Sequence, residues 1–170
     1  MPPTLALVGY SGCGKTTLLT HLLPLLKPYR VGVIKHAHHN VELDTPGKDS
    51  YRIRHAGAAE TLIATRQRWA LLVEQPSPTQ EPQLTELLPR LALDHLDLVL
   101  LEGFKHEAIP KIEIHRPSSG HPALYPSDPH IIAVASDQPL PHPWHGTALD
   151  LNDPSAIADF IRHYLTTHTP

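Results

Sequence analysis

The feature that most constrains this chain lies close to its first residue, where positions 9–16 read GYSGCGKT. The run satisfies the pattern G-x-x-x-x-G-K-[ST], and it stands between an apolar run at residues 4–8 and leucines at helical spacing in residues 15–26. Glycine lets a backbone take conformations that other residues avoid, so successive N–H groups of such a loop can turn inward onto phosphate oxygens. The following helix adds the positive end of its dipole. The sequence therefore predicts a strand, a phosphate-binding loop and a helix, in that order.

The residues of this loop have expected roles in binding a nucleotide. We expect Lys15 to reach the β- and γ-phosphates as a point charge, and the Thr16 hydroxyl to coordinate Mg²⁺. A glycine turn that serves packing alone is the alternative, and the strand and helix on either side argue against it. The other residues expected to contact the nucleotide are Gly9, Ser11, Gly12, Cys13, Gly14 and Thr17.

Apolar runs along the chain predict the fold. They lack the alternation of a strand that has one face in water, which indicates a parallel sheet, and they occupy residues 4–8, 31–34, 96–101 and 131–135. Helices are expected at residues 15–26, 49–59, 84–93 and 153–165. Further strands, the last alternating as if half solvated, are expected to extend the sheet antiparallel at residues 60–64, 69–74 and 111–115. The expected fold is α/β, the P-loop NTPase three-layer fold, with a mostly parallel central sheet and antiparallel strand additions.

Length and composition limit the classes of protein to which the chain can belong. With 170 residues, we expect a single nucleotide-binding domain over positions 1–170. The formal net charge of -3, with 14 lysines and arginines spread along the sequence, argues against nucleic acid and a membrane surface as partners. No apolar run reaches membrane-spanning length and no leader precedes the first strand, so we expect a cytoplasmic protein. Cys13 is the only cysteine, which excludes an intrachain disulfide and a four-cysteine zinc site.

A phosphate-binding loop of this kind needs an acidic group at the end of a neighbouring strand, to hold Mg²⁺ through water or to orient the attacking water. Glu102 ends an apolar strand, whereas Asp97 begins the same strand and belongs to the opposite edge of the sheet, roughly 16 Å away. We therefore prefer Glu102, with an ordinary strand-end carboxylate as the alternative. Asp44, in the loop after the second predicted strand, is a further candidate for metal binding or catalysis. The Gly103 N–H is expected near the γ-phosphate, and Lys105 is either a second anion contact or solvated.

The loop after the second predicted strand is rich in basic and imidazole side chains, namely Lys35, His36, His38 and His39. A Zn²⁺ or Ni²⁺ site is one interpretation of the histidines, while phosphate or substrate contacts and plain exposure are the others. The sequence contains no Asn-Lys-x-Asp signature for guanine. Asp137 follows the predicted strand at residues 131–135, where its carboxylate can accept the two donors on the edge of guanine, and turn capping is the alternative.

Several blocks occur in an order that resembles the molybdopterin-guanine dinucleotide biosynthesis adapter family, MobB. The blocks are GYSGCGKTT at residues 9–17, KHAHH at 35–39, Asp44 with GKDS at 47–50, AGA at 56–58 and EGFK at 102–105. The resemblance spans most of the chain. It implies GTP binding with Mg²⁺, slow hydrolysis at most, a homodimer, and assistance to the guanylyltransferase that joins GMP to molybdopterin.

The same resemblance implies an anionic pterin, for which Lys35, His36, Arg52 and Arg54 would supply charge-assisted hydrogen bonds. Solvated arginines on a helix face are the alternative. Tyr10 stands where many related GTPases that mature metalloenzymes have an additional lysine, so a catalytic lysine from that position is not expected. Two other functions stay open at this point. One is a small-molecule kinase, and the other is a nickel- or zinc-inserting GTPase whose ligands would be the loop histidines.

Overall fold

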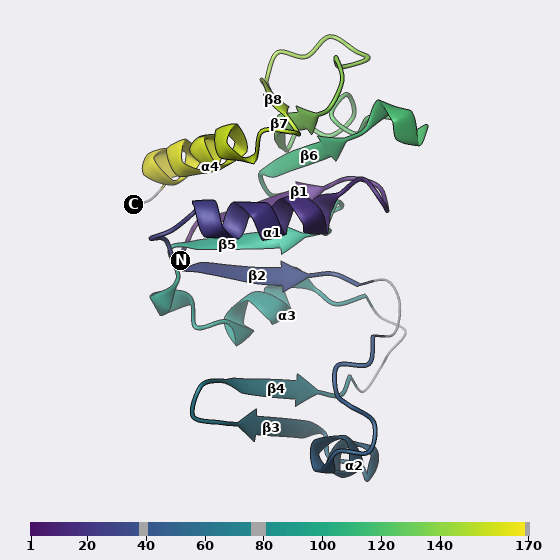
Figure 1. The fold of residues 1–170 in the computed structure, drawn as a ribbon, viewed down its shortest axis with the longest axis vertical. Helices are drawn as coiled ribbons and strands as arrows, with labels where there is room; N and C mark the ends of the chain where they lie inside the picture. The colour runs from purple at the N-terminus through teal and green to yellow at the C-terminus, as the bar shows by residue number, and fades with distance from the viewer. Residues whose placement is uncertain (38–40, 76–80, 169–170) are drawn as a thin grey trace. The chain divides into compact units, whose positions relative to one another are not determined.

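A computed structural model describes residues 1–37, 41–75 and 81–168 of the chain. The chain forms two compact units (Figure 1). The large unit comprises Met1–His36 and Gln83–Pro170, and the small unit comprises Ala37–Pro82. In sequence, the small unit is an insertion within the large one.

The large unit is built on a six-stranded sheet in the order β2-β5-β1-β6-β7-β8, and every pair of neighbouring strands in it is parallel. Its strands are β1 Thr4–Val8, β2 Val31–Lys35, β5 Leu98–Glu102, β6 Lys111–His115, β7 Ile131–Ser136 and β8 Thr147–Asp150. Its helices are α1 Lys15–Leu25, α3 Leu84–Leu87 and α4 Pro154–His168, with short 3₁₀ turns at Leu88–Arg90, Leu93–His95 and Pro117–Ser119.

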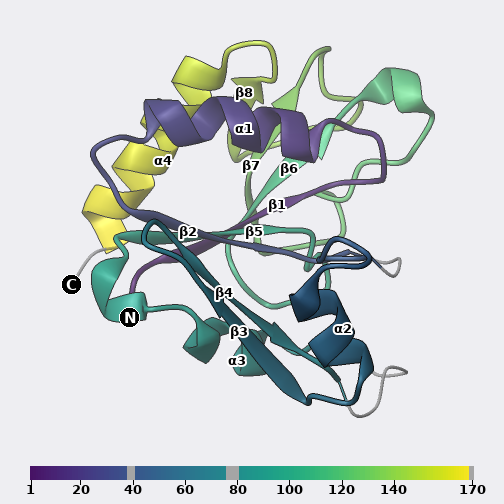
Figure 2. The ribbon, with the colours of Figure 1, turned by 60° about the horizontal axis from the view of Figure 1, so that its bottom comes forward.

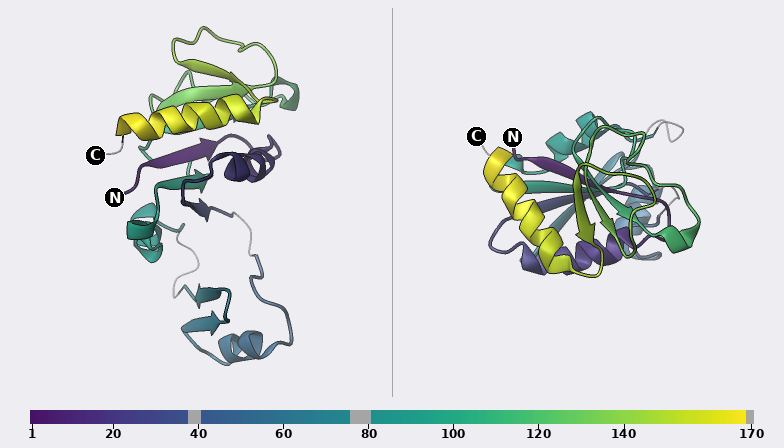
Figure 3. Two further views of the ribbon diagram at one scale, coloured as in Figure 1. Left: turned by 60° about the vertical axis from the view of Figure 1, so that its left-hand side comes forward. Right: turned by 90° about the horizontal axis from the view of Figure 1, so that it is seen from above.

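Helices cover both faces of this sheet. Figure 2 shows α1 and α4 above the sheet and α3 below it, and the view from above in Figure 3 shows α1 and α4 along one face. A hydrophobic core lies on each face of the sheet, and alternate residues of β1 point into one or the other. Leu5 and Leu7 face α1 and α4, while Ala6 and Val8 pack with the cluster that contains Leu84 of α3. The expected α/β three-layer fold with a mostly parallel sheet is therefore confirmed.

The placement of three strands and the length of one helix differ from the sequence expectation. β3 Glu60–Ala64 and β4 Trp69–Val73 are antiparallel to each other, as expected, but they form a separate two-stranded sheet in the small unit together with α2 Asp49–His55. β6, expected to be antiparallel and half solvated, lies parallel between β1 and β7 with all its residues buried. The expected helix at residues 84–93 is only the short α3 and a 3₁₀ turn that contains Pro89, which lacks an N–H donor.

The polar residues of β6 are buried because protein groups, rather than water, satisfy them. The Lys111 ammonium, in a residue only 2% exposed, donates to the Asp128 carboxylate at 2.7 Å. The Glu113 carboxylate accepts the backbone N–H groups of Leu124 and Tyr125, each at 2.8 Å. The segment after β6 therefore covers the polar face of this strand, and an alternating pattern in the sequence does not here indicate solvent.

Glu113 gives this part of the fold a dependence on pH. Burial raises the pKa of its carboxyl group and the nearby Asp128 charge adds to the rise, against the opposing effects of the two N–H donors and of His115. A carboxyl group whose pKa is raised on folding stabilises the folded state below its ordinary pKa, near 4.5, and this stabilisation is lost as the pH rises through the folded value.

We therefore expect the free energy of unfolding of the wild type, relative to that of Glu113→Gln, to fall as the pH is raised from about 4 to about 7. Glutamine does not titrate, so the difference between the proteins isolates the carboxyl group from all other acids. Urea unfolding of both proteins across this range measures the effect. A difference that stays constant or grows with pH would contradict it.

Candidate functional site

The loop between β1 and α1 has the backbone that the motif predicts. Gly9 has φ +146°, and a Cβ at this position would lie 2.5 Å from the Ile114 carbonyl oxygen of β6. Gly14 has φ +99° at the residue that precedes α1, and its carbonyl accepts the Leu18 N–H as the helix begins. Both positions thus require glycine, the first because of close packing and the second because of its left-handed backbone.

Lys15 folds back over this loop. Its ammonium donates to the backbone carbonyls of Gly9 at 2.9 Å and Tyr10 at 2.8 Å. Cys13 is buried beneath the loop, 3% exposed, whereas Ser11, Gly12, Thr16 and Thr17 are exposed. The loop therefore presents a positive charge and a run of exposed residues at the carboxyl edge of the parallel sheet, where α/β proteins bind ligands.

Thr16, Lys35 and Glu102 meet beside the loop. The Thr16 hydroxyl lies 2.6 Å from Glu102 Oε1, and the Lys35 ammonium lies 2.5 Å from that oxygen and 3.0 Å from Thr16 Oγ1. Glu102 Oε2 is buried and has no hydrogen-bond partner among the described residues. Asp97, at the other end of β5, bonds instead to the Arg30 N–H at 2.7 Å. The structure therefore brings together Thr16 and Glu102, the pair expected for metal binding.

Arg116 is a residue of this site that the sequence expectation missed. Its Nε donates to the Cys13 carbonyl of the loop at 3.0 Å, and its Nη1 pairs with the Asp137 carboxylate. The signal was present, because Arg116 directly follows β6 just as Glu102 ends β5. An antiparallel β6 would have placed Arg116 at the opposite edge of the sheet, and that wrong expectation hid it.

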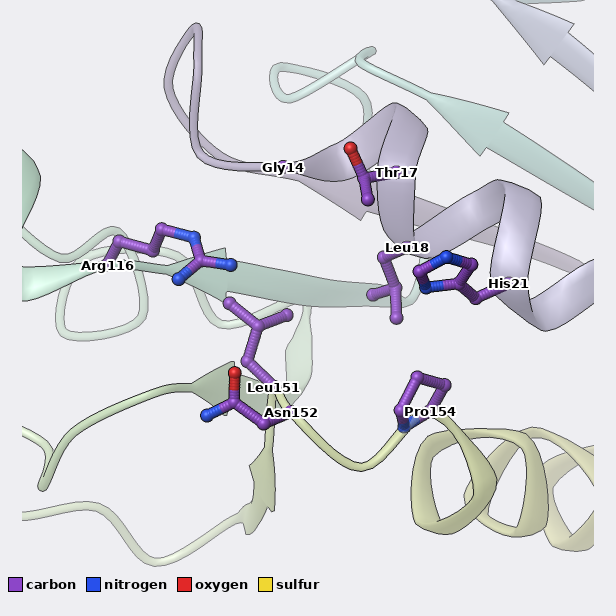
Figure 4. A pocket seen from close by; sticks show the side chains of 8 residues that line it. All are labelled: Gly14, Thr17, Leu18, His21, Arg116, Leu151, Asn152 and Pro154. Atoms are coloured by element: carbon purple, nitrogen blue, oxygen red, sulfur yellow. The ribbon is translucent and has the colours of Figure 1, made fainter.

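A pocket of about 230 Å³ opens beside the loop, between α1, the residue after β6 and the turn from β8 to α4 (Figure 4). Figure 4 shows the Leu151 side chain near the centre of the pocket, with Arg116 on one side of it, Leu18 on the other, and Thr17 and Asn152 at the rim. An apolar wall with a few polar groups at its rim is typical of small-molecule binding sites. The lining residues are Gly14, Thr17, Leu18, His21, Arg116, Leu151, Asn152 and Pro154.

The segment that follows β5 also borders the loop. The Gly103 N–H, expected near a γ-phosphate, donates to the Leu7 carbonyl of β1 at 3.1 Å. The Lys105 ammonium lies 5.6 Å from the centre of the Tyr10 ring, whose other neighbour is the stacked ring of His121 at 4.4 Å. Lys105 therefore lies beside the phosphate-binding loop, as an anion contact would require.

His36 ends the part of the histidine-rich loop that belongs to the large unit. Its backbone N–H donates to the Glu102 carbonyl at 2.9 Å. Its ring packs against the ring of Phe104, with 5.1 Å between the two ring centres. His38 and His39 lie outside the residues that the structure describes. Within the described ranges, no group of three or more His, Cys, Asp or Glu side chains is placed to hold a metal ion.

Asp44, Arg52 and Arg54 all lie in the small unit. Arg54, whose side chain is only 11% exposed, pairs with Glu42 and with Glu74. The hydrogen bond from Arg54 lowers the pKa of Glu42, against the smaller effect of burial. Arg52 is exposed and lies 3.8 Å from the Asp49 carboxylate, and Asp44 Oδ1 accepts the Thr45 N–H at 2.8 Å. Arg54 is thus held by carboxylates of its own unit, whereas Arg52 is open to solvent.

A glycine loop between a central parallel strand and a helix, with a threonine hydroxyl beside a strand-end carboxylate, defines a protein of the P-loop NTPase fold class. None of the helices in the described ranges is long and apolar enough to cross a membrane. The family described as molybdopterin guanine dinucleotide synthesis protein B, MobB, matches residues 4–137. The chain belongs to this family.

Individual relatives agree with this assignment. A molybdopterin-guanine dinucleotide biosynthesis adapter protein of Escherichia coli (strain K12) is 48% identical over 168 residues, which cover 97% of this chain and 94% of that protein. The protein of the same description from Haemophilus influenzae is 45% identical over 165 residues, covering 96% and 89%. The crystal structure of a MobB homolog from Bacillus stearothermophilus aligns with a TM-score of 0.70 at 26% identity, covering 97% of this chain and 99% of the other. The family resemblance seen in the sequence is confirmed.

Proposed function

We propose that this chain is a GTP-binding adapter in the biosynthesis of molybdopterin guanine dinucleotide. Membership of the MobB family supports the pathway and the adapter role, because the relatives that match most of the chain are described in those words. The observation that carries the nucleotide part is the loop of residues 9–16, with Lys15 across it and Thr16 bonded to Glu102. The proposal covers residues 1–170 as one functional domain in the cytoplasm, with hydrolysis slow at most.

The residues at the loop fit a nucleotide bound with Mg²⁺. The exposed loop and Lys15 would hold the phosphates, and Thr16 and Glu102 supply the hard oxygen ligands that Mg²⁺ prefers. The buried Glu102 Oε2, which no described donor satisfies, is suited to a water molecule of the metal. When bound, Mg²⁺ would neutralise charge on the β- and γ-phosphates.

The pocket beside Gly14 and Thr17 is the proposed position of the base. Arg116 and Asn152 would face its polar edge, while Leu18 and Leu151 would pack on its flat face. Asp137 pairs with Arg116 through Oδ2 and would thereby orient the guanidinium that faces the base. We propose that its other oxygen, Oδ1, accepts a hydrogen bond from the base. Guanine preference itself is proposed from the family.

The proposed partners are the guanylyltransferase, molybdopterin and a second copy of the chain. Exposed apolar residues on one face of the β3–β4 sheet support the homodimer, since Leu62 and Leu71 are directly opposite each other and Trp69 is 66% exposed. A two-stranded sheet is marginally stable unless something covers its apolar face. Contacts from Asp44, Arg52 and the histidines to nucleotide or pterin stay predictions.

Titration with fluorescent GTP and ATP in Mg²⁺ tests the ligand. We expect GTP to bind at least about tenfold more tightly, which corresponds to about 1.4 kcal/mol of base recognition. Equal affinities would contradict the GTP proposal.

The adapter role is tested by adding the protein to purified guanylyltransferase with molybdopterin and GTP. The dinucleotide yield is expected to rise, and an unchanged yield would overturn this role.

A further inference from the structure

Lys35 occupies a position that the register of the sheet determines. It is the last residue of β2 and pairs in register with Glu102, the last residue of β5. The adjacent His36 N–H donates to the Glu102 carbonyl, which continues the ladder past Lys35. Half of the Lys35 side chain is exposed, 51%, but its ammonium lies against a carboxylate whose side chain is only 7% exposed. The parallel pairing therefore brings a flexible cation to a buried acid.

The position of the ammonium is the one that a metal ion at this site needs. Thr16 Oγ1 donates its single proton to Glu102 Oε1 at 2.6 Å, so only lone pairs of the hydroxyl remain for a cation. The Lys35 ammonium uses one of them at 3.0 Å and lies 2.5 Å from Glu102 Oε1. A Mg²⁺ ion bound by Thr16 would share Thr16 Oγ1 and the negative charge of Glu102 with the Lys35 ammonium. Two cations at such distances repel each other.

We propose that Lys35 is an internal counter-ion of the magnesium site, which Mg²⁺ must displace from Thr16 and Glu102 when it binds with the nucleotide. Without the metal, the ammonium neutralises Glu102 and keeps Thr16 and the two strand ends together. With the metal, it leaves the carboxylate, and its exposed, flexible stem allows this movement. Lys35 therefore raises the Mg²⁺ concentration that nucleotide binding requires. This inference rests on the proposed nucleotide function.

Lys35→Met tests the competition, because it removes the charge and keeps an unbranched side chain. The measurement is the Mg²⁺ concentration that half-saturates binding of a fluorescent, non-hydrolysable GTP analogue held at fixed concentration. We expect this concentration to fall by about three- to tenfold, as for the loss of one charged hydrogen-bond partner. Lys35→Arg keeps the charge and is expected to stay within about twofold of the wild type. Lys27→Met, which removes an exposed charge beyond the far end of α1, is the matched control and is expected to change nothing.

Other outcomes separate the possible roles of Lys35. An unchanged or higher Mg²⁺ requirement in Lys35→Met, with weaker binding of the analogue at every Mg²⁺ concentration, would show a plain phosphate contact and would overturn the proposal. An equal decrease in Lys27→Met would show a general effect of net charge and would overturn it too. If the wild type binds no analogue at any Mg²⁺ concentration, the proposed nucleotide function fails instead. Direct titration of the wild type and Lys35→Met with Mn²⁺ alone then still reports the competition between the ammonium and the metal ion.

Discussion

Lys15→Ala is expected to weaken the binding of GTP by at least about 100-fold. Lys15 is the only charged residue of the loop at positions 9–16, and its ammonium lies across the loop at the Gly9 and Tyr10 carbonyls. Two charge-assisted hydrogen bonds to phosphate contribute together about 3 kcal/mol or more, which corresponds to this loss. Isothermal titration calorimetry with GTP and Mg²⁺ measures it.

The control for this variant is Lys27→Ala, which removes an exposed lysine outside the loop and is expected to bind GTP as the wild type does. Helical content by circular dichroism checks that α1 has kept its structure, since Lys15 is the first residue of that helix. Binding by Lys15→Ala within about fivefold of the wild type would remove the loop from the account of nucleotide binding.

Asp128→Asn is expected to lower the free energy of unfolding by about 3 kcal/mol. The substitution leaves the Lys111 ammonium, in a residue 2% exposed, without the carboxylate that neutralises it at 2.7 Å. Breaking a buried ion pair from one side is costly because the other charge stays buried and uncompensated. Urea unfolding at neutral pH, analysed with a common slope, measures the difference.

Two further variants show whether burial is the reason for the expected loss of stability in Asp128→Asn. Asp159→Asn breaks the exposed pair with Arg162 in α4 and is expected to cost less than about 0.5 kcal/mol. Lys111→Met is expected to cost less than Asp128→Asn, because Asp128 is partly exposed and still accepts the His130 N–H at 2.9 Å. Equal losses for the pairs at Asp128 and Asp159 would contradict a burial effect.

The central features of the site could be predicted because local pattern and strand ends determine them. The glycine loop needs only its own residues and the strand and helix beside it. Glu102 was preferable to Asp97 because a parallel strand places its last residue at the ligand edge, and the structure has Glu102 bonded to Thr16. The apolar runs of β1, β5 and β7 were long enough to identify as buried strands, whereas β2, expected to be buried as well, is an edge strand that is only partly buried.

The remaining features depend on contacts between distant parts of the chain. The polarity of β6 suggested solvent, but Asp128 and the N–H groups of Leu124 and Tyr125, which follow their partners in β6 by 11 to 17 residues, satisfy its charged side chains. The error in its direction then concealed Arg116. β8 is a four-residue edge strand with mostly exposed side chains, so it has no clear hydrophobic pattern.

The strand order also bears on how the protein folds. β1 pairs with β5 and β6, so this strand finds its neighbours after residues 98–115 have been synthesised. The Ile114 carbonyl against which Gly9 packs arrives equally late. Pairings of such large sequence separation form slowly, because the entropy of closing a long loop opposes them. The loop at residues 9–16 leaves the ribosome before its supporting strands, and it gains them only when the chain has been made as far as His115.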